Sequence, residues 1–150
     1  MKSFSLALLA LLVFSACGSP QPSVRTSATD FPKLNKNQMW QLSLLNGRNL
    51  PNDAKITTLS FNPEAGSFRG QTACNSYAGA YLLGETSAAD GRRSFSILLL
   101  TPGSIRCPEA DMNTEERFLS VLKKANYILI TEYSLSLYHD NKEILHFELQ

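Results

Sequence analysis

Polar and apolar residues alternate along most of the chain after residue 38, and this period of two is typical of β-strands that bury one face. Turn residues such as Asn46-Gly47 and Asn62-Pro63 separate the alternating segments. Segments 56–61 and 67–73 are therefore predicted to form a hairpin. The predicted strands lie within 38–47, 56–61, 67–73, 78–84, 93–100, 126–132, 134–139 and 143–149.

One segment has the period of a helix instead. In residues 112–126, apolar side chains recur at the spacing i, i+3, i+4, i+7, namely at Phe118, Val121, Leu122 and Ala125. Asn113 and Glu116 have the spacing of a capping box. Lys123 and Lys124 are predicted to lie in the last turn, where they complement the helix dipole. The predicted fold class is α+β, with a curled antiparallel sheet that forms a partial barrel of about eight short strands and packs against one helix near residues 112–125.

The strand predicted at 93–100 ends in four consecutive apolar residues, Ile97 to Leu100. Phe95, Ile97 and Leu99 alternate, and the run places apolar groups on both faces of the strand, so one face belongs in the core and the other meets the helix, a ligand cavity or a partner. Burial of that second face beneath the helix is the simpler interpretation. The alternative is a cavity between sheet and helix that holds an acyl chain or an apolar peptide.

The N-terminus has the features of an export signal. An apolar run follows Lys2 and is shorter than the roughly 20 residues of a transmembrane helix, so a cleavable lipoprotein signal peptide is predicted at 1–16. The order Phe-Ser-Ala-Cys at 14–17 resembles the lipobox of bacterial lipoproteins. That resemblance implies a fatty-acid anchor, such as palmitate, on Cys17, and Gly18 implies sorting to an outer membrane. The alternative is an ordinary signal peptide that leaves Cys17 as a free thiol.

Residues 17–37 are rich in Ser, Thr, Pro and Asn, so they are predicted to form the lipid anchor and a flexible tether. The remaining residues, 38–150, are long enough for one hydrophobic core and form one predicted domain. The chain of 150 residues carries 14 Lys and Arg against 13 Asp and Glu, spread along its length. Nucleic-acid binding is therefore not expected, because it requires a concentrated basic face.

The chain has three cysteines, of which Cys17 is predicted to carry the lipid. Cys74 and Cys107 are then the two thiols of an exported domain, where disulfides form and persist, so they are predicted to pair with each other. Two free thiols or a redox-active pair are the alternatives, but the long separation favours a structural bond. A metal site is not expected, because His139 and His146 lie far along the chain and structural zinc needs four ligands at short spacings.

Four motifs, in order, resemble the META domain family, which is typified by the heat-shock protein HslJ. They are a Trp-x-Leu strand, "GQTACNSYAGAY" at 70–81, a Cys-Pro pair and the helix segment "EERFLSVL" at 115–122. The motif positions are occupied by Trp40, Leu42, Gly70, Cys74, Asn75, Tyr77, Gly79, Cys107, Pro108, Glu115 and Phe118. The resemblance implies an antiparallel sheet with a helix, an envelope location and a link to stress or drug tolerance, with no agreed biochemical activity.

The motif residues have structural interpretations as well as functional ones. Asn75 is predicted to close a local turn in the left-handed region rather than to serve as a binding amide. Tyr77 is predicted to be a packed aromatic whose hydroxyl needs a partner, and Gly79 a site of close backbone approach. Pro108 suits the start of the helix. His146 alternates with apolar neighbours, which predicts a surface or rim position.

The sequence contains no nucleophile elbow, zinc-protease motif, P-loop or paired-carboxylate signature, so an enzyme is not expected and no cofactor is predicted. The first hypothesis is a non-catalytic lipoprotein of the cell envelope, anchored in the outer membrane facing the periplasm, with a binding role in envelope stress or drug tolerance. Its expected partners are the membrane, through the lipid, and an envelope protein or hydrophobic ligand. The second hypothesis is a pilotin-like or lipocalin-like carrier of a lipid or apolar peptide between sheet and helix. A secreted enzyme or thiol oxidoreductase is the third.

Overall fold

The computed structural model describes residues 34–36, 38–51, 54–86 and 90–150. The predicted signal peptide, the lipidation site Cys17 and most of the predicted tether lie outside the described residues. In chain order, the elements are β1 (Trp40–Leu45), β2 (Arg48–Asn49), β3 (Thr58–Asn62), β4 (Ser67–Gln71), β5 (Ser76–Thr86), β6 (Arg93–Pro102), α1 (Glu109–Leu122), β7 (Tyr127–Ile130), β8 (Ser134–His139) and β9 (Lys142–Leu149).

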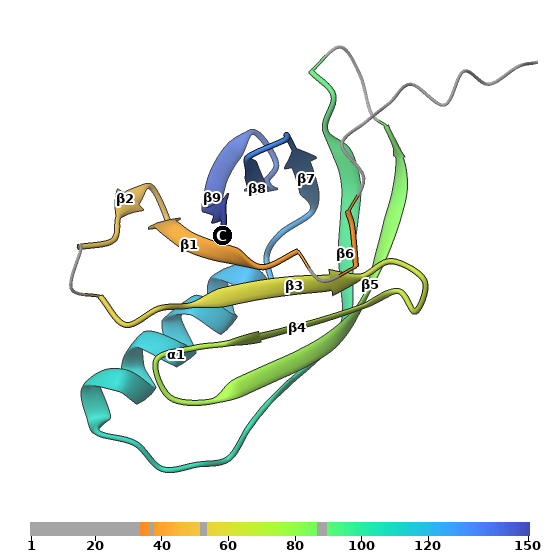
Figure 1. The fold of residues 1–150 in the computed structure, drawn as a ribbon. Helices are drawn as coiled ribbons and strands as arrows, with labels where there is room; N and C mark the ends of the chain where they lie inside the picture. Colours follow the sequence, from red (N-terminus) through yellow and green to blue (C-terminus); the bar gives the residue numbers. More distant parts are fainter. Residues whose placement is uncertain (1–33, 37, 52–53, 87–89) are drawn as a thin grey trace, which may run out of the picture.

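Eight strands form a closed antiparallel barrel, and β2 pairs with β1 outside it (Figure 1). β1 closes the ring by pairing with both β3 and β9, so that Trp40 lies opposite Leu59 on one side and Leu149 on the other. The predicted α+β class and antiparallel sheet are confirmed, but the prediction of a partial barrel is wrong. Closure has a physical reason, because an open sheet would leave polar backbone groups of its edge strands without partners.

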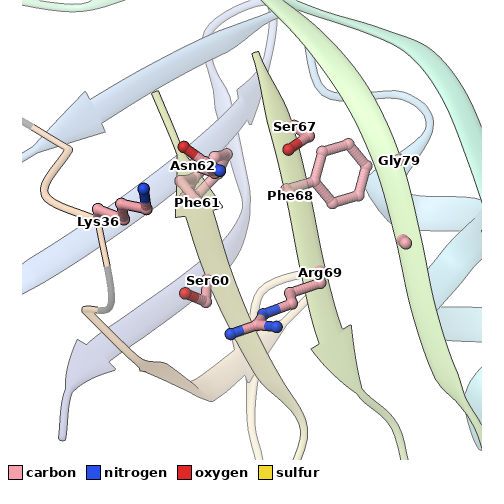
Figure 2. A pocket seen from close by; sticks show the side chains of 9 residues that line it. Lys36, Ser60, Phe61, Asn62, Ser67, Phe68, Arg69 and Gly79 are labelled. Atoms are coloured by element: carbon pink, nitrogen blue, oxygen red, sulfur yellow. The ribbon is translucent and has the colours of Figure 1, made fainter. Parts of the chain in front are cut away.

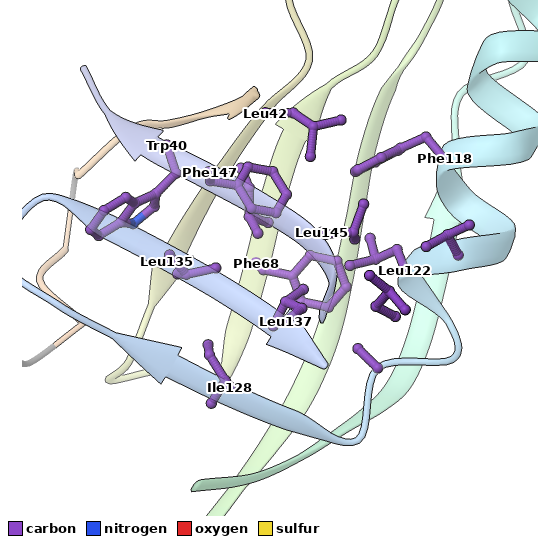
Figure 3. Close-up of a cluster of buried hydrophobic side chains, with 14 of the residues drawn as sticks. Trp40, Leu42, Phe68, Phe118, Leu122, Ile128, Leu135, Leu137, Leu145 and Phe147 are labelled. Carbon is purple, nitrogen blue, oxygen red and sulfur yellow. The ribbon is translucent and has the colours of Figure 1, made fainter. Parts of the chain in front are cut away.

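Apolar side chains that alternate along the strands fill the barrel interior (Figure 3). A row of aromatic rings belongs to this core: the ring centre of Tyr81 lies 5.1 Å from that of Phe61 and 5.8 Å from that of Phe95. Aromatic pairs at such distances stabilise a core beyond their buried area. The largest fully buried side chains are Trp40, Phe95, Phe118, Phe147, Leu59, Leu122, Ile128, Leu135, Leu137 and Leu145.

Helix α1 packs against the barrel through its apolar face. The ring centre of Phe118 lies 5.4 Å from that of Tyr77 in β5 and 6.5 Å from that of Phe147 in β9. Phe118 and Leu122 project from the helix toward the strands, so protein side chains occupy the space between helix and sheet (Figure 3). All the predicted apolar helix positions are buried, as expected. In the described part of the chain, no helix has the length and apolar character needed to cross a membrane.

The helix spans Glu109–Leu122 and so begins and ends a few residues earlier than predicted. Pro108 directly precedes it with a φ of −51°, an angle already suited to the start of a helix. Asn113 therefore lies inside the helix, and the predicted capping box is wrong, because no side chain in the described part of the chain caps the N-terminus. Two acidic residues of the first turn instead favour the positive end of the helix dipole. Lys123 is the C-cap and Lys124 follows it, so neither lies in the last turn.

A bulge in β6 changes which of its leucines face outward. Ala80 of β5 lies opposite Leu99, whereas the next residue, Tyr81, lies opposite Ile97, so Leu98 is an extra residue in the strand. Leu98 and Leu99 are 60 % and 59 % exposed. The prediction that the helix buries the second apolar face of this strand is therefore wrong.

Candidate functional site

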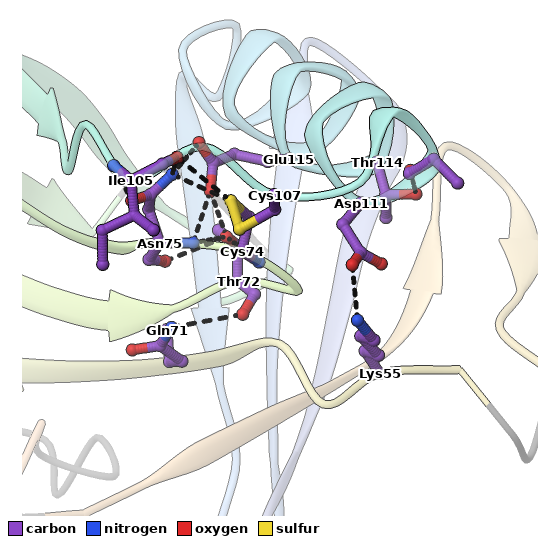
Figure 4. A network of polar contacts seen from close by, with 11 residues as sticks. Lys55, Gln71, Thr72, Cys74, Asn75, Ile105, Cys107, Asp111, Thr114 and Glu115 are labelled. Atoms are coloured by element: carbon purple, nitrogen blue, oxygen red, sulfur yellow. Dashed lines mark hydrogen bonds and ion pairs between the residues drawn. A yellow bond between two sulfur atoms is a disulfide. The ribbon is translucent and has the colours of Figure 1, made fainter.

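Cys74 and Cys107, the predicted pair, form a disulfide with 5.8 Å between their Cα atoms (Figure 4). Cys74 lies in the turn between β4 and β5, and Cys107 lies in the segment between β6 and α1. The bond therefore ties the sheet to the start of the helix. Because both sulfur atoms are used in it, neither is a free thiol or a metal ligand in this state.

Asn75 connects the same two segments through its side chain. Its amide nitrogen donates to the Ile105 carbonyl at 3.2 Å, and its amide oxygen accepts from the Ile105 N–H at 2.8 Å. Its backbone closes the turn, because the Thr72 N–H donates to the Asn75 carbonyl at 2.8 Å. Asn75 is 4 % exposed and therefore acts inside the fold. The prediction of a left-handed backbone here is wrong, since among the described non-glycine residues only Asn46 and Asp140 have a positive φ.

Glu115 of α1 is the third member of this network. Its carboxylate accepts from the Asn75 backbone N–H at 2.8 Å, from the Asn75 side-chain amide at 3.1 Å and from the Thr72 hydroxyl. Hydrogen bonds to an ionised carboxylate are stronger than neutral ones, so Glu115 fastens the helix to the turn. Its contacts were not predicted, although one signal exists: Glu115 lies three residues before Phe118 and so shares its helix face.

A cross-strand pair of a glycine and an aromatic residue accounts for Gly70. Gly70 of β4 is the register partner of Tyr77 of β5, and the Tyr77 ring lies against it. The Tyr77 hydroxyl donates to the Thr58 carbonyl at 2.7 Å. Burial raises the pKa of Tyr77, which keeps this donor protonated. A Cβ atom on Gly70 would overlap the Thr58 carbonyl oxygen and lie 2.5 Å from the Tyr77 hydroxyl, so a larger residue does not fit without movement.

Gly79 forms a second pair of the same kind. It is the register partner of Phe68, whose ring is buried in the barrel. A Cβ atom on Gly79 would overlap the Phe68 ring and the Leu99 carbonyl oxygen of β6. Both glycines thus leave the space that an aromatic ring needs over the neighbouring strand.

The remaining motif residues also occupy structural positions. Trp40 is 1 % exposed and lies where β1 meets β3 and β9. Pro108 directly precedes the helix. The motif residues described here therefore hold strands, turn and helix together.

The two histidines lie apart from this network. His146 Nδ1 is 2.8 Å from both Ser136 Oγ and Glu143 Oε1, and the residue is partly buried. His139 is exposed, with its Nδ1 2.8 Å from the Lys124 carbonyl oxygen. Within residues 34–36, 38–51, 54–86 and 90–150, no three His, Cys, Asp or Glu side chains are grouped as metal ligands would be.

Two adjoining hollows lie on the outer face of β3, β4 and β5, and together they are called the outer groove. Their volumes are about 380 Å³ and 670 Å³, and both are lined by Ser60, Arg69 and Ala78. The smaller hollow also includes Lys36 and Asn62 (Figure 2). Many of the lining side chains are small, which leaves open space above the strands.

The outer groove has an uneven distribution of polar groups. Arg69 is exposed, and in the described part of the chain no carboxylate lies within ion-pair distance of it. Lys36 forms an ion pair with Glu64 at 2.9 Å, and exposed pairs of this kind are weak. The amide oxygen of Asn62 is buried, and no described residue donates a hydrogen bond to it, which is costly unless another donor reaches it. Sequence reasoning missed this groove, because its residues belong to separate segments and form no motif.

Two solved structures are similar to this chain. An NMR structure of a protein from Burkholderia xenovorans has 22 % sequence identity and a TM-score of 0.55, and the match covers 77 % of this chain and 83 % of that one. A second NMR structure has 22 % identity and a TM-score of 0.50, with 76 % and 90 % covered. At this identity the likeness concerns the fold alone. No curated protein matches the chain.

The family model of the META domain matches residues 33–150. This range includes all nine strands and the helix of the described structure. It also includes the whole ordered set of motifs from Trp40 to Phe118. The chain belongs to the META domain family.

Proposed function

We propose that this protein is a non-catalytic, lipid-anchored binding protein of the cell envelope. Cys17 carries the fatty acids, the following segment is the tether, and the META domain binds an envelope component in the outer groove. The outer-membrane location facing the periplasm and the role in envelope stress or drug tolerance are part of this proposal. The META domain family is not known as catalytic, and the barrel fold is consistent with a binding protein.

The binding role depends on one observation, the exposed Arg69 in the outer groove with no carboxylate partner among the described residues. A guanidinium on a concave surface is suited to bidentate contacts with an anionic group. The polar side chains of the motif, by contrast, are already engaged, as the hydrogen bonds of Asn75 and Tyr77 demonstrate. The outer groove, and not the motif, is therefore the proposed binding surface.

A carrier with its cavity between sheet and helix is not favoured. Phe118 packs against Tyr77 and Phe147, and Leu122 beside it is fully buried. An acyl chain at this place would have to displace these side chains and lose their packing, which costs about 2–5 kcal/mol for each large apolar residue.

Intact-mass analysis of the full chain, extracted with detergent from bacterial membranes, tests the anchor. We expect a chain that begins at Cys17 and carries added fatty acids, because two or more acyl chains anchor a protein stably. The Cys17→Ser variant is expected in the soluble fraction, since serine offers no thiol for the lipid. An unmodified thiol at Cys17 in the membrane-extracted chain would contradict the anchor.

Photocrosslinking in intact cells tests the binding surface. A photoreactive amino acid in place of Ala78, which lines both hollows, is expected to give a discrete product, whereas one in place of the exposed Glu132 between β7 and β8 is not. Arg69→Ala is expected to reduce the Ala78 product by about fivefold or more, because it removes a charge-assisted contact. Arg48→Ala, an exposed arginine of β2, is the matched control and should leave the product unchanged. Equal products at both positions, or a product insensitive to Arg69→Ala, would rule out the outer groove.

A further inference from the structure

We infer that the smaller hollow of the outer groove binds a monocarboxylate that also carries hydroxyl groups, which is the chemistry of a sugar acid. Arg69 receives the carboxylate, and the polar side chains around it, Asn62 above all, receive the hydroxyls. This inference rests on the proposed function, because it names the ligand class of the same groove.

Arg69 provides the recognition of the carboxylate. Its neighbour Phe68 points into the barrel, so alternation along β4 directs Arg69 to the outer face. Its guanidinium extends beside β3, on the same side as Ser60 and Lys36 (Figure 2). A guanidinium presents a planar fork of donors that matches the two oxygens of a carboxylate. The described residues supply no such carboxylate, so the ligand is the fitting partner.

The charges at the smaller hollow favour a ligand with a single negative charge. Lys36 and Glu64 are paired at 2.9 Å and neutralise each other, which leaves the positive charge of Arg69. A phosphate monoester carries about −1.5 to −2 at pH 7, so part of its charge would remain unpaired and would face Glu64. A carboxylic acid is singly ionised at that pH and matches Arg69, which has no ion-pair partner among the described residues.

Asn62 is the observation from which we infer that the ligand carries hydroxyl groups besides its carboxylate. Its amide oxygen is buried and has no hydrogen-bond partner among the described residues, and Asn62 lines the smaller hollow. As observed, this oxygen is closed off from the hollow, so the inferred contact requires the amide to turn toward the hollow when a ligand hydroxyl donates to it. Ser60 and Ser67 line the same hollow and can both donate and accept. A simple acid without hydroxyls would leave these groups unused.

The size and polarity of the hollow agree with a single sugar ring. Its volume of about 380 Å³ lies at the lower end of small-molecule sites, which span about 300–1,000 Å³. Phe61 and Phe68 line it, but each is only 3 % exposed, so their rings offer little apolar contact. Ala78 and Gly79 also line it, with minimal side chains. A polar ligand is therefore favoured over an apolar one.

Titration of the lipidated full chain in detergent micelles with glucuronate, glucose and inorganic phosphate tests this inference. Glucuronate and glucose share the ring and differ in the carboxylate, so their comparison isolates the contact with Arg69. We expect glucuronate to bind at least about tenfold more tightly than either of the others. The affinity should fall as salt is raised, because the contact is exposed. Equal binding of glucuronate and glucose, or tighter binding of phosphate, would overturn the inference.

Substitutions of Arg69 and of Glu64 should change the glucuronate affinity in opposite directions. Arg69→Ala is expected to lower it about tenfold, and the control Arg48→Ala to change it by less than about twofold. Glu64→Gln is expected to raise it about twofold, because it releases Lys36 from its ion pair. A merely structural role of Glu64 would not produce that gain. An unchanged affinity in Arg69→Ala would overturn the inference.

Asn62→Leu tests the hydroxyl contact separately. We expect it to lower the affinity for glucuronate about threefold and to leave the weaker binding of acetate, which has no hydroxyl, unchanged. Because the leucine removes a buried acceptor to which no residue in the described ranges donates, the fold should not lose stability. Equal effects on glucuronate and acetate would overturn the role of Asn62.

The failure of this inference can be told apart from the failure of the proposed function. A crosslink at Ala78 that depends on Arg69, together with no binding of glucuronate, would overturn the ligand class and leave the binding role standing. Loss of both the crosslink and the glucuronate binding would overturn the ligand class and the binding role together. Binding of glucuronate that requires Arg69 supports the ligand class whether or not a macromolecule is crosslinked.

Discussion

Replacing Cys74 and Cys107 together with alanine is expected to lower the free energy of unfolding by about 3–4 kcal/mol. The two residues are 33 positions apart, and a crosslink over that distance removes a corresponding amount of conformational entropy from the unfolded chain. The loss is a large part of the roughly 5–15 kcal/mol that stabilises a typical domain. Urea denaturation measures it, with the fluorescence of the single, buried Trp40 as the signal.

Two comparisons make this measurement specific. The reduced wild-type chain should lose the same free energy of unfolding as the double variant. Cys17→Ser should lose none, because position 17 precedes the residues that match the META domain. A loss below about 1 kcal/mol in the double variant would contradict the expected entropy effect. The network of Asn75 and Glu115 would then be sufficient to hold the helix to the turn.

Gly70→Ala is expected to lower the free energy of unfolding by about 3 kcal/mol, at the upper end of the usual cost of overpacking a core. The added methyl group overlaps the Thr58 carbonyl oxygen, which belongs to the backbone and cannot rotate away. It also crowds the Tyr77 hydroxyl, so relief by strand movement would weaken the Tyr77–Thr58 hydrogen bond, worth about 1 kcal/mol. The same urea denaturation, followed by Trp40 fluorescence, gives the value.

Gly47→Ala is the matched control for the loss of a glycine. No atom of the described residues lies within 4 Å of a Cβ atom built at that position, although its φ is +80°. Only backbone strain of about 1–2 kcal/mol is therefore expected. Equal losses in the two variants would show that lack of space is not the reason for a glycine at Gly70.

Most of the fold follows from local patterns, and the exceptions have physical causes. The alternation of polar and apolar residues located the strands, because each strand of the barrel buries one face in the same interior. Closure was not predicted, since the pairing of Trp40 with Leu149 joins distant parts of the chain and leaves no local signal. The capping pattern at Asn113 is not used, because the helix begins earlier, directly after Pro108. The outward position of Leu99 depends on a bulge, which shifts the register by one residue and is not marked in the sequence.

Of the candidate site, only the disulfide bond could be predicted from the sequence. Counting cysteines, with Cys17 set aside for the predicted lipid anchor, was enough to pair Cys74 with Cys107, whereas the contacts of Glu115 require the helix to be placed against the turn. The outer groove was not predictable, because Arg69 and Lys36 come from separate segments. Its shape also depends on small residues, and these are unremarkable in a strand.

Stability and crosslinking, measured on the same preparations of two variants, separate the structural motif from the binding groove. Asn75→Ala should lower the free energy of unfolding by about 2 kcal/mol, because it leaves buried partners unsatisfied, yet its folded fraction should keep the crosslink at Ala78. Arg69→Ala should stay within about 0.5 kcal/mol of the wild type, as surface substitutions usually do, and should lose the crosslink. A folded Asn75→Ala variant without the crosslink, or an Arg69→Ala variant that keeps it, would contradict this division of roles.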